Sequence, residues 1–414
     1  MGRVPLRGGG VHRRSRRRHR PRGAPAARGL ARADSHLRGG ATRRRGRCRR
    51  GHPRDRPRGR PMTGRRLTRV PLRAPDADVV VVGSGVAGLA AAARLTTAGR
   101  LVRVLEAGPV AGGRVGSALH DGFAVDEGLH LLDAAAAWPT DLVDPAALDL
   151  RPLDPTEGLV DGQDAPVRLG DDAVPATGPL AAGISRPAAP ALPAHGLVAL
   201  TVQLTAHLDS PVVTGAHVEV VRWHGGSWQV VGDHGTWTTG QVVLAVPPEE
   251  ATHLLHGTRI EHELAHPEWL GTTTWWLAPE AAPSPSRSLR VDARRAPGPV
   301  AATVVVTNVA PGYSEDGRAL VAATVPHRGG RPVAGEAAVR AHLSELWGTA
   351  AFDWPVVARQ DHPRAVPVPV PTPDAAGPLA LELAPGLVLA GDHLAPGVTG
   401  ALASGDAAAR VLLA

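Results

Sequence analysis

The chain has 414 residues, which is enough for two lobes around a large apolar core. Its formal charge of +8 arises in residues 1–75, which hold 26 arginines and only two acidic residues. The rest of the chain holds 20 arginines and 36 acidic residues, so its negative charge argues against nucleic acid as a partner of the folded part.

Residues 1–75 consist mainly of arginine, glycine, proline and alanine, with almost no periodic apolar positions. Such a segment cannot bury enough apolar surface to offset its chain entropy, so we expect it to be disordered. It also lacks the apolar stretch of a secretory signal. Three interpretations stay open: a translated lead-in with the true start at or near Met62, a solvated extension without function, or an arm that binds RNA or a membrane.

The only cysteine, Cys48, lies in this arginine-rich segment. The folded part therefore has no disulfide, thiolate metal site or redox dithiol, and we expect a cytoplasmic location. No run of 18 apolar residues is free of charges, glycine and proline. We expect no transmembrane span, while peripheral contact with a membrane stays open.

The most informative stretch runs from Asp78 to Asp133. Residues 79–82 are four consecutive valines, which predict a strand that is buried on both faces. A G-x-G-x-x-G loop follows at once over residues 83–88, and an alanine-rich helix runs on to Ala98. Residues 101–105 predict a second strand, which ends on Glu106.

Each part of this unit has a physical role in binding a dinucleotide. Gly83 allows a tight turn, Gly85 lets the backbone approach a pyrophosphate, and Gly88 lets the helix pack closely on the strand. The helix N-terminus offers free N–H groups to the phosphates. Glu106 stands about 20 residues further on, where a carboxylate accepts the hydroxyls of an adenosine ribose. The spacing therefore predicts a bound adenine dinucleotide.

Two further motifs indicate which dinucleotide is bound. Glu106 is followed by the Gly-Gly-Arg run at residues 112–114, and an apolar run at 387–390 is followed by Gly-Asp and by the small residues 397–401. Together these resemble the FAD-dependent oxidoreductases of the flavin amine oxidase and phytoene desaturase superfamily. Residues 125–128 are similar to the turn that this family places beside the isoalloxazine ring.

The resemblance implies a role for each matching position. Arg114 would hold the phosphates or the flavin edge, and Asp392 the ribityl chain or the pyrophosphate. N–H groups near Gly400 and Ala401 would face the flavin N1/C2 carbonyl, and Val218 would contact adenine through its backbone. The implied FAD-binding residues are Gly83, Ser84, Gly85, Val86, Ala87, Gly88, Glu106, Ala107, Gly112, Gly113, Arg114, Val115, Gly128, Val218, Gly391, Asp392, Gly400 and Ala401.

The middle of the chain has weaker patterns. Residues 134–195 are rich in alanine, proline, aspartate and glycine, which predicts either a reduced cap or a loop-rich lid over the cofactor. A helix is expected over 196–208, and a buried strand over 241–246. Three short strands are expected between them, at 212–214, 218–223 and 228–231, and the last two form a hairpin around Gly225-Gly226.

The remaining residues predict a second sheet. Strands are expected over 272–277, 300–309 and 319–324, an amphipathic helix over 335–347, and extended chain over 354–378. The fold class is then α/β: a Rossmann-like FAD-binding domain with a mostly parallel sheet and helices, and an inserted antiparallel substrate lobe. After the segment 1–75, we assign 76–135, 196–260 and 385–414 to the FAD-binding domain, and 136–195 and 261–384 to the substrate lobe.

The sequence assigns no catalytic residue and no metal site. His130 could reach the flavin face or could be a packed histidine, and Trp275 and Trp276 could wall a substrate tunnel or pack in the core. Asp133 and Asn308 could supply polar contacts, although surface roles suit both. The chain has no lysine, whereas amine oxidases of the resembled family often use one near flavin N5.

These features favour an FAD-dependent oxidoreductase, either a dehydrogenase/desaturase or an oxidase. It would act on an organic, apolar small molecule by hydride transfer to flavin N5. The electron acceptor, whether oxygen, a quinone or another molecule, stays open. Two alternatives remain: a redox-neutral flavin isomerase of the same fold, and a flavin-fold binding module that has lost catalysis along with much of its cap.

Overall fold

The computed structural model describes residues 76–170, 187–262, 264–328, 334–368, 378–395 and 397–414. All of them lie in one compact unit, residues 70–414. The segment predicted to be disordered, with Cys48 and Met62, lies outside the described residues. Among the described residues, no helix is long and apolar enough to cross a membrane.

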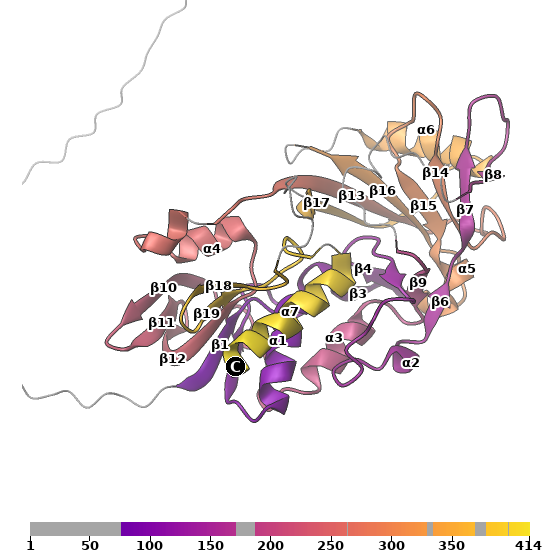
Figure 1. Ribbon diagram of the computed structural model, residues 1–414. Coiled ribbons are helices and arrows are strands. Elements are labelled where there is room, and N and C mark those ends of the chain that lie inside the picture. The colour runs from indigo at the N-terminus through magenta and orange to yellow at the C-terminus, as the bar shows by residue number, and fades with distance from the viewer. Residues whose placement is uncertain (1–75, 171–186, 263, 329–333, 369–377, 396) are drawn as a thin grey trace, which may run out of the picture. The chain divides into compact units, whose positions relative to one another are not determined.

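A mixed sheet with a parallel centre forms the first layer (Figure 1). Its parallel strands are, in spatial order, β2 (Val102–Leu105), β1 (Ala77–Val82), β12 (Gly235–Leu244) and β19 (Leu387–Leu389). The hairpin of β10 (Val218–His224) and β11 (Ser227–Gly232) continues the sheet beyond β12, and β18 (Leu381–Ala384) pairs with β19.

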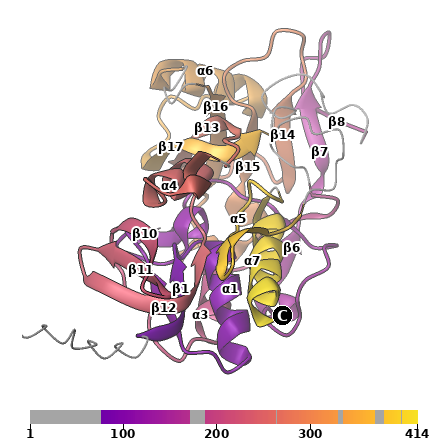
Figure 2. The same cartoon turned by 60° about the vertical axis from the view of Figure 1, so that its left-hand side comes forward.

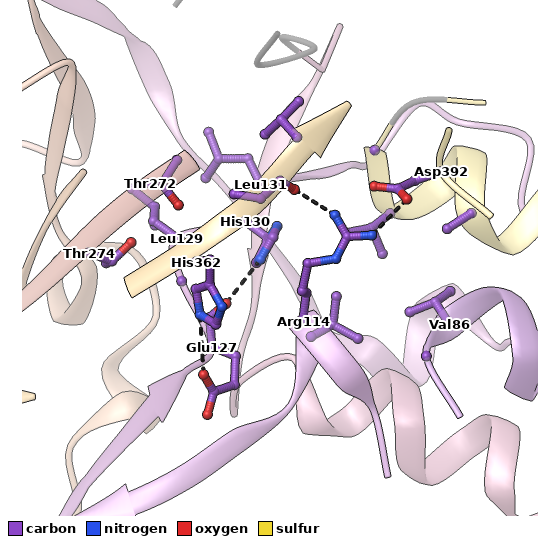
Figure 3. A pocket seen from close by; sticks show the side chains of 18 of the residues that line it. Val86, Arg114, Glu127, Leu129, His130, Leu131, Thr272, Thr274, His362 and Asp392 are labelled. Atoms are coloured by element: carbon purple, nitrogen blue, oxygen red, sulfur yellow. Dashed lines mark hydrogen bonds and ion pairs between the residues drawn. The ribbon is translucent and has the colours of Figure 1, made fainter. Parts of the chain in front are cut away.

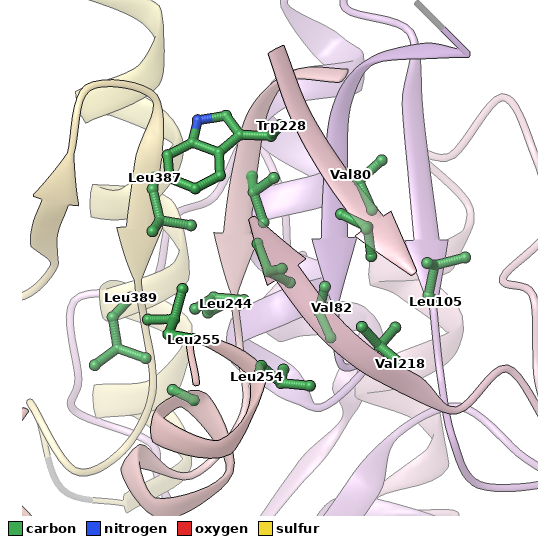
Figure 4. Packing of buried hydrophobic residues seen from close by; sticks show 14 of the residues in the cluster. Val80, Val82, Leu105, Val218, Trp228, Leu244, Leu254, Leu255, Leu387 and Leu389 are labelled. Atoms are coloured by element: carbon green, nitrogen blue, oxygen red, sulfur yellow. The ribbon is translucent and has the colours of Figure 1, made fainter. Parts of the chain in front are cut away.

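Two helices cover one face of this sheet, α1 (Val86–Thr97) and α7 (Gly397–Leu413). They lie side by side in both views (Figures 1 and 2). The valines of β1 alternate between the two faces and are buried on both, as expected for a central parallel strand. Beneath the opposite face, α4 (Pro248–Leu254) packs with the β10–β11 hairpin on an apolar cluster that includes Val80, Leu244 and Trp228 (Figure 4).

A second sheet is almost entirely antiparallel. Its strand order is β17 (Val356–Val368), β13 (Glu268–Leu277), β16 (Val321–His327), β15 (Ala302–Val305), β14 (Ser288–Asp292), β7 (Asp154–Leu159) and β8 (Val167–Arg168). Only β14 and β7 run parallel among these strands. Helix α6 (Glu336–Trp347) packs on the outer face, against Trp275, Leu277 and Val325. Alternate residues, such as Trp276 and Ala322, face inward.

Shorter elements connect the two sheets. The β3 (Ser117–His120) and β4 (Phe123–Asp126) hairpin leads into a small sheet of β5 (Leu132–Asp133), β9 (Pro190–Pro193) and β6 (Leu150–Pro152). Helix α2 (Pro145–Leu148) packs with α1 and α3 (Val198–Thr205) in one apolar cluster. The described residues also form single helical turns, namely η1 (Gly113–Val115), η3 (Arg259–His262), α5 (Val306–Val309) and η4 (Pro311–Tyr313).

The α/β fold class and most of the predicted elements are confirmed, but two predictions are wrong. The run 300–309 is not one strand: β15 ends at Val305 and residues 306–309 form a helical turn. Residues 212–214 make only a single bridge, between Val213 and Leu105. The described part of residues 134–195 supplies the short strands β6 to β9, of which β7 and β8 extend the second sheet, and the cap prediction stays a prediction. The proposed domain boundaries stay a prediction.

Candidate functional site

A cavity of about 400 Å³ lies between the carboxyl edge of the parallel sheet and the inner face of the second sheet (Figure 3). The loops after β1, β12 and β19 contribute Gly85, Val246 and Asp392 to its wall. Strands β13 and β16 contribute Thr274 and Thr324 from the other side. Crevices at the carboxyl ends of parallel strands are the usual ligand sites of open α/β sheets.

The three glycines of the loop after β1 have different roles. Gly83 has a φ of +96°, and a Cβ there would lie 2.5 Å from the Ala245 carbonyl oxygen. A Cβ on Gly88 would lie 2.0 Å from the Gly83 carbonyl oxygen, so a side chain at either position would force the backbone to shift. Gly85 has no such neighbour within 4 Å and lines the cavity. Its missing side chain leaves space that a ligand can occupy.

Helix α1 begins directly after Gly85 and directs its N-terminus at the cavity. Gly85 is the N-cap residue, and no side chain caps the helix. The N–H groups of the first turn therefore have no acceptor within the helix, and together with the helix dipole they favour an anion. Val86 and Ala87 of this turn line the cavity, and Gly112 of the second motif forms a bridge with Gly85.

Glu106 is fixed at the end of β2 by donors from two loops. One carboxylate oxygen accepts hydrogen bonds from the Ser84 N–H at 2.8 Å and the Ser84 hydroxyl at 2.7 Å. The other accepts from the Gly108 N–H at 2.7 Å. Ser84 is fully buried, so its side chain cannot contact a ligand directly and instead positions the Glu106 carboxylate.

An ion pair joins the two distant motifs at the cavity wall. The Arg114 Nη2 lies 2.7 Å from the Asp392 Oδ1, although 278 positions separate the two residues. Arg114 Nη1 also donates to the Ala365 carbonyl oxygen at 2.6 Å. The segment after β2 that carries the Gly-Gly-Arg run and the loop after β19 therefore meet at the cavity wall.

The C-terminal helix begins earlier than expected. Helix α7 starts at Gly397, so the free N–H groups belong to residues 397–399, and the predicted donors at Gly400 and Ala401 lie inside the helix. A Cβ on Gly400 would lie 2.0 Å from the Ala395 carbonyl oxygen, which makes Gly400 a packing position. Gly397, Val398 and Ala401 line the cavity.

The turn at Gly128 is held against the second sheet. Its φ is +99°, and its N–H donates to the Gln360 Oε1 at 3.1 Å. The same oxygen accepts from the Trp276 indole at 2.9 Å. Gln360 thus fixes the loop that carries Glu127 and His130 into the cavity.

Two histidines flank Glu127 in the cavity wall (Figure 3). The His130 Nε2 lies 3.2 Å from the Glu127 carbonyl oxygen, and the His362 Nε2 lies 3.3 Å from its carboxylate. Burial, followed by the charge of Arg114, lowers the pKa of His130 to about 4. His130 is therefore neutral at neutral pH, and the cavity gains no cation from it.

The sequence-predicted residues divide into two groups. Those that line the cavity are Gly85, Val86, Ala87, Gly112, Arg114, Val115, Gly128, Gly391, Asp392 and Ala401. Those that do not are Gly83, Ser84, Gly88, Glu106, Ala107, Gly113, Val218 and Gly400. Of the second group, Val218 is buried beneath the sheet beside Val82 and Leu105 (Figure 4), and Ala107 is exposed.

The sequence did not indicate several residues that line the cavity. Thr272, Thr274, Thr324, His362 and His393 all line the cavity. Alternation along the predicted strand 272–277 was the one signal that Thr272 and Thr274 share a face.

The other polar and aromatic candidates have structural roles. Asp133 accepts from the N–H groups of Ala135, Ala188 and Ala189. Asn308 donates to two backbone carbonyls, and Trp275 and Trp276 pack in apolar clusters on opposite faces of β13.

Comparison with known proteins agrees with this geometry. Residues 81–142 match the family model of the NAD(P)-binding Rossmann-like domain. Over 59 residues the chain is 49% identical to a phytoene dehydrogenase of Streptomyces griseus, a match that covers 14% of this chain and 12% of that protein.

Solved structures are similar over most of the chain. A putative protoporphyrinogen oxidase of Exiguobacterium sp. 255-15 has a TM-score of 0.63 at 18% identity, covering 81% of this chain and 98% of that one. Putrescine oxidase bound to putrescine has a TM-score of 0.59 at 18% identity, covering 81% and 99%. Reduced UDP-galactopyranose mutase has a TM-score of 0.54 at 14% identity, covering 71% and 84%.

These likenesses confirm two sequence predictions: the Rossmann-like fold, and the resemblance to flavin amine oxidases and phytoene desaturases. At such identities the solved structures establish the fold alone. The sequence match to the phytoene dehydrogenase spans about an eighth of that protein's length, within the glycine-loop region.

Proposed function

We propose that this chain, with the fold of flavin amine oxidases and phytoene desaturases, is an FAD-dependent oxidoreductase of a small, apolar organic substrate. The observation that carries the proposal is the Arg114–Asp392 ion pair beside the open backbone of Gly85. It brings the pyrophosphate-type loop and the C-terminal flavin-type motif to one cavity. A cytoplasmic location is part of the same proposal, since cysteine is absent from residues 49–414.

The residues present fit an FAD molecule. The space beside Gly85 and the first turn of α1 suit the pyrophosphate. Glu106 already accepts three hydrogen bonds, and of its roughly four lone-pair sites one is left for a ribose hydroxyl. Asp392 and the first turn of α7 suit the polar part of the flavin. The roles of Val218 and Gly400 would be indirect, through packing.

Bound FAD would supply the hydride acceptor at its N5 atom. The chain's own contribution is to bind, orient and exclude water. Leu129, Leu131, Leu289 and Val291 give the substrate side an apolar wall. Arg114 is paired with Asp392 and His130 is neutral, so the described wall suits an uncharged substrate better than an acid.

A redox-neutral isomerase is the second candidate. The fold similarity to reduced UDP-galactopyranose mutase supports it, since that enzyme's name describes a rearrangement. The two candidates differ in the need for an electron acceptor. An oxidoreductase turns over only while oxygen, a quinone dye or another acceptor is supplied, whereas an isomerase continues without one.

The test is the absorption spectrum of the purified full-length protein. We expect the bands of oxidised flavin, release of FAD on denaturation as identified by mass, and loss of the bands on anaerobic photoreduction. A protein that stays colourless after incubation with FAD would overturn the proposal. A yellow protein that cannot be photoreduced would favour a binding module without catalysis.

A further inference from the structure

Two threonine hydroxyls on the inner face of the second sheet have no hydrogen-bond partner among the described residues. The Oγ1 atoms of Thr274 and Thr324 are both buried and unpaired, and the two residues are 1% and 5% exposed. Both residues line the cavity. An unpaired buried hydroxyl lowers folding stability, so its presence calls for an explanation.

The two threonines are direct neighbours. Thr274 of β13 and Thr324 of β16 are cross-strand partners in the antiparallel register. Such partners place their Cβ atoms about 5 Å apart on the same face. Rotation about each Cα–Cβ bond can turn both hydroxyls towards one atom in the cavity.

On one side, towards β15 and β14, apolar residues border this pair. Leu289, Val291 and Ala302 line the same part of the second sheet. On the other side Gln360 of β17 is the cross-strand partner of Thr274, and its amide oxygen already accepts from the Gly128 N–H and the Trp276 indole. Valine would fill each threonine site equally well and suits a strand, so neither packing nor strand preference explains the hydroxyls. A polar ligand atom in the cavity does.

The charges of the cavity wall indicate which kind of ligand atom the two hydroxyls bind. Arg114 is paired with Asp392, and Glu127 is the other carboxylate of the described wall. A hydroxyl pair without a cation binds a neutral oxygen, to which each threonine can donate or from which it can accept. A carboxylate or phosphate would lack a countercharge at this position.

We propose that the substrate is an apolar molecule with one neutral oxygen function, a carbonyl or a hydroxyl, that is bound by Thr274 and Thr324. This assignment rests on the proposed function, because it identifies the substrate class of that cavity. The hydroxyl pair positions the apolar skeleton within the cavity.

The experiment compares three compounds with one carbon skeleton: camphor, borneol and bornane, which carry a carbonyl, a hydroxyl and no oxygen. Calorimetric titration of the FAD-loaded full-length protein gives their dissociation constants. We expect camphor or borneol to bind more tightly than bornane. The double variant Thr274→Val/Thr324→Val should lose about 2- to 10-fold of that preference, the size of a neutral hydrogen bond.

Two further variants separate recognition from folding. Thr273→Val removes a hydroxyl from the opposite face of the same strand, where it donates to the Asp361 Oδ1 at 2.6 Å. This control should lower the thermal midpoint and keep the oxygen preference. The double serine variant at 274 and 324 retains both hydroxyls and should also keep the preference. The double valine variant should be at least as stable as the parent.

Equal affinity of the parent for all three compounds, or an undiminished preference in the double valine variant, would overturn the assignment. Failure of the proposed function is a separate result, because it shows as the absence of FAD from the purified protein. The titration can then be repeated without FAD and still reports on the hydroxyl pair.

Discussion

Among the glycines of the loop after β1, only Gly85 faces open space in the cavity. Gly83 and Gly88 each have a carbonyl oxygen where a Cβ would stand. The sequence motif does not distinguish the three glycines, whereas the structure separates two whose missing side chains the packing requires from one that faces the open cavity.

This difference predicts the behaviour of Gly85→Ala. The free energy of unfolding should change by less than about 1 kcal/mol, because the added methyl group meets no atom and the backbone conformation is ordinary. FAD affinity should fall by roughly 10-fold or more, since the methyl group occupies the space beside the phosphates. Urea unfolding and titration of the apoprotein with FAD measure the two effects.

Gly83→Ala is the matched control for this prediction. It should destabilise the fold, because the residue has a positive φ and meets the Ala245 carbonyl oxygen. If Gly85→Ala binds FAD as tightly as the parent, the pyrophosphate does not lie beside this loop. Glu106→Ala is a less selective test, since Glu106 also holds the Ser84 and Gly108 N–H groups.

At this scale, the sequence was sufficient wherever a residue's role follows from its local motif. The spacing pointed to Gly85 and Arg114, which line the cavity, and to Glu106, which lies behind its wall. Thr324 and His362 were not found, because their role depends on what faces them across the cavity. Strand alternation can place Thr274 on a face, but it cannot show that its hydroxyl lacks a partner.

Helices α1 and α7 approach closely enough for backbone contact. A Cβ on Gly405 would lie 2.0 Å from the Ala87 carbonyl oxygen. Small residues such as Ala91 and Ala408 continue the contact in the same apolar cluster. This packing fixes the start of α7, and with it the cavity residues Val398 and Ala401.

Gly405→Val should therefore damage both stability and cofactor binding. Forcing the helices apart should cost at least about 1–3 kcal/mol, and the displaced start of α7 should weaken FAD binding. Thermal unfolding and FAD titration provide the readouts. Ala407→Val, at a less buried site of the same helix, should change both much less. Equal effects of the two substitutions would show that the helix contact does not support the site.

The predictable elements were those with strong local patterns. The strand–helix–strand unit and the β10–β11 hairpin follow from short-range periodicity and turn residues. Strand β7 was missed because its pairing with β14 joins residues about 130 positions apart in a segment with few large apolar groups. The turn at Val306–Val309 continues a β-branched run, and only tertiary contacts, such as those of Asn308 with Ser284 and Ser286, end the strand there.

The chain as a whole closes the site by returning its C-terminus to the first sheet. Strand β19 lies beside β12, which pairs with β1 on its other side, and α7 then packs on α1. The motifs at the two ends made this closure predictable. The cavity wall that the second sheet forms was not predictable, because the registers of β13, β16 and β17 are set by non-local pairing.

A crystal structure of the protein grown with FAD tests the central claim most directly. It should contain one FAD molecule, with its pyrophosphate beside Gly85 and the first turn of α1. Its flavin end should reach Asp392 and the start of α7 in the same cavity. Crystals without FAD, or with FAD held by the glycine loop but away from residues 391–401, would contradict the account.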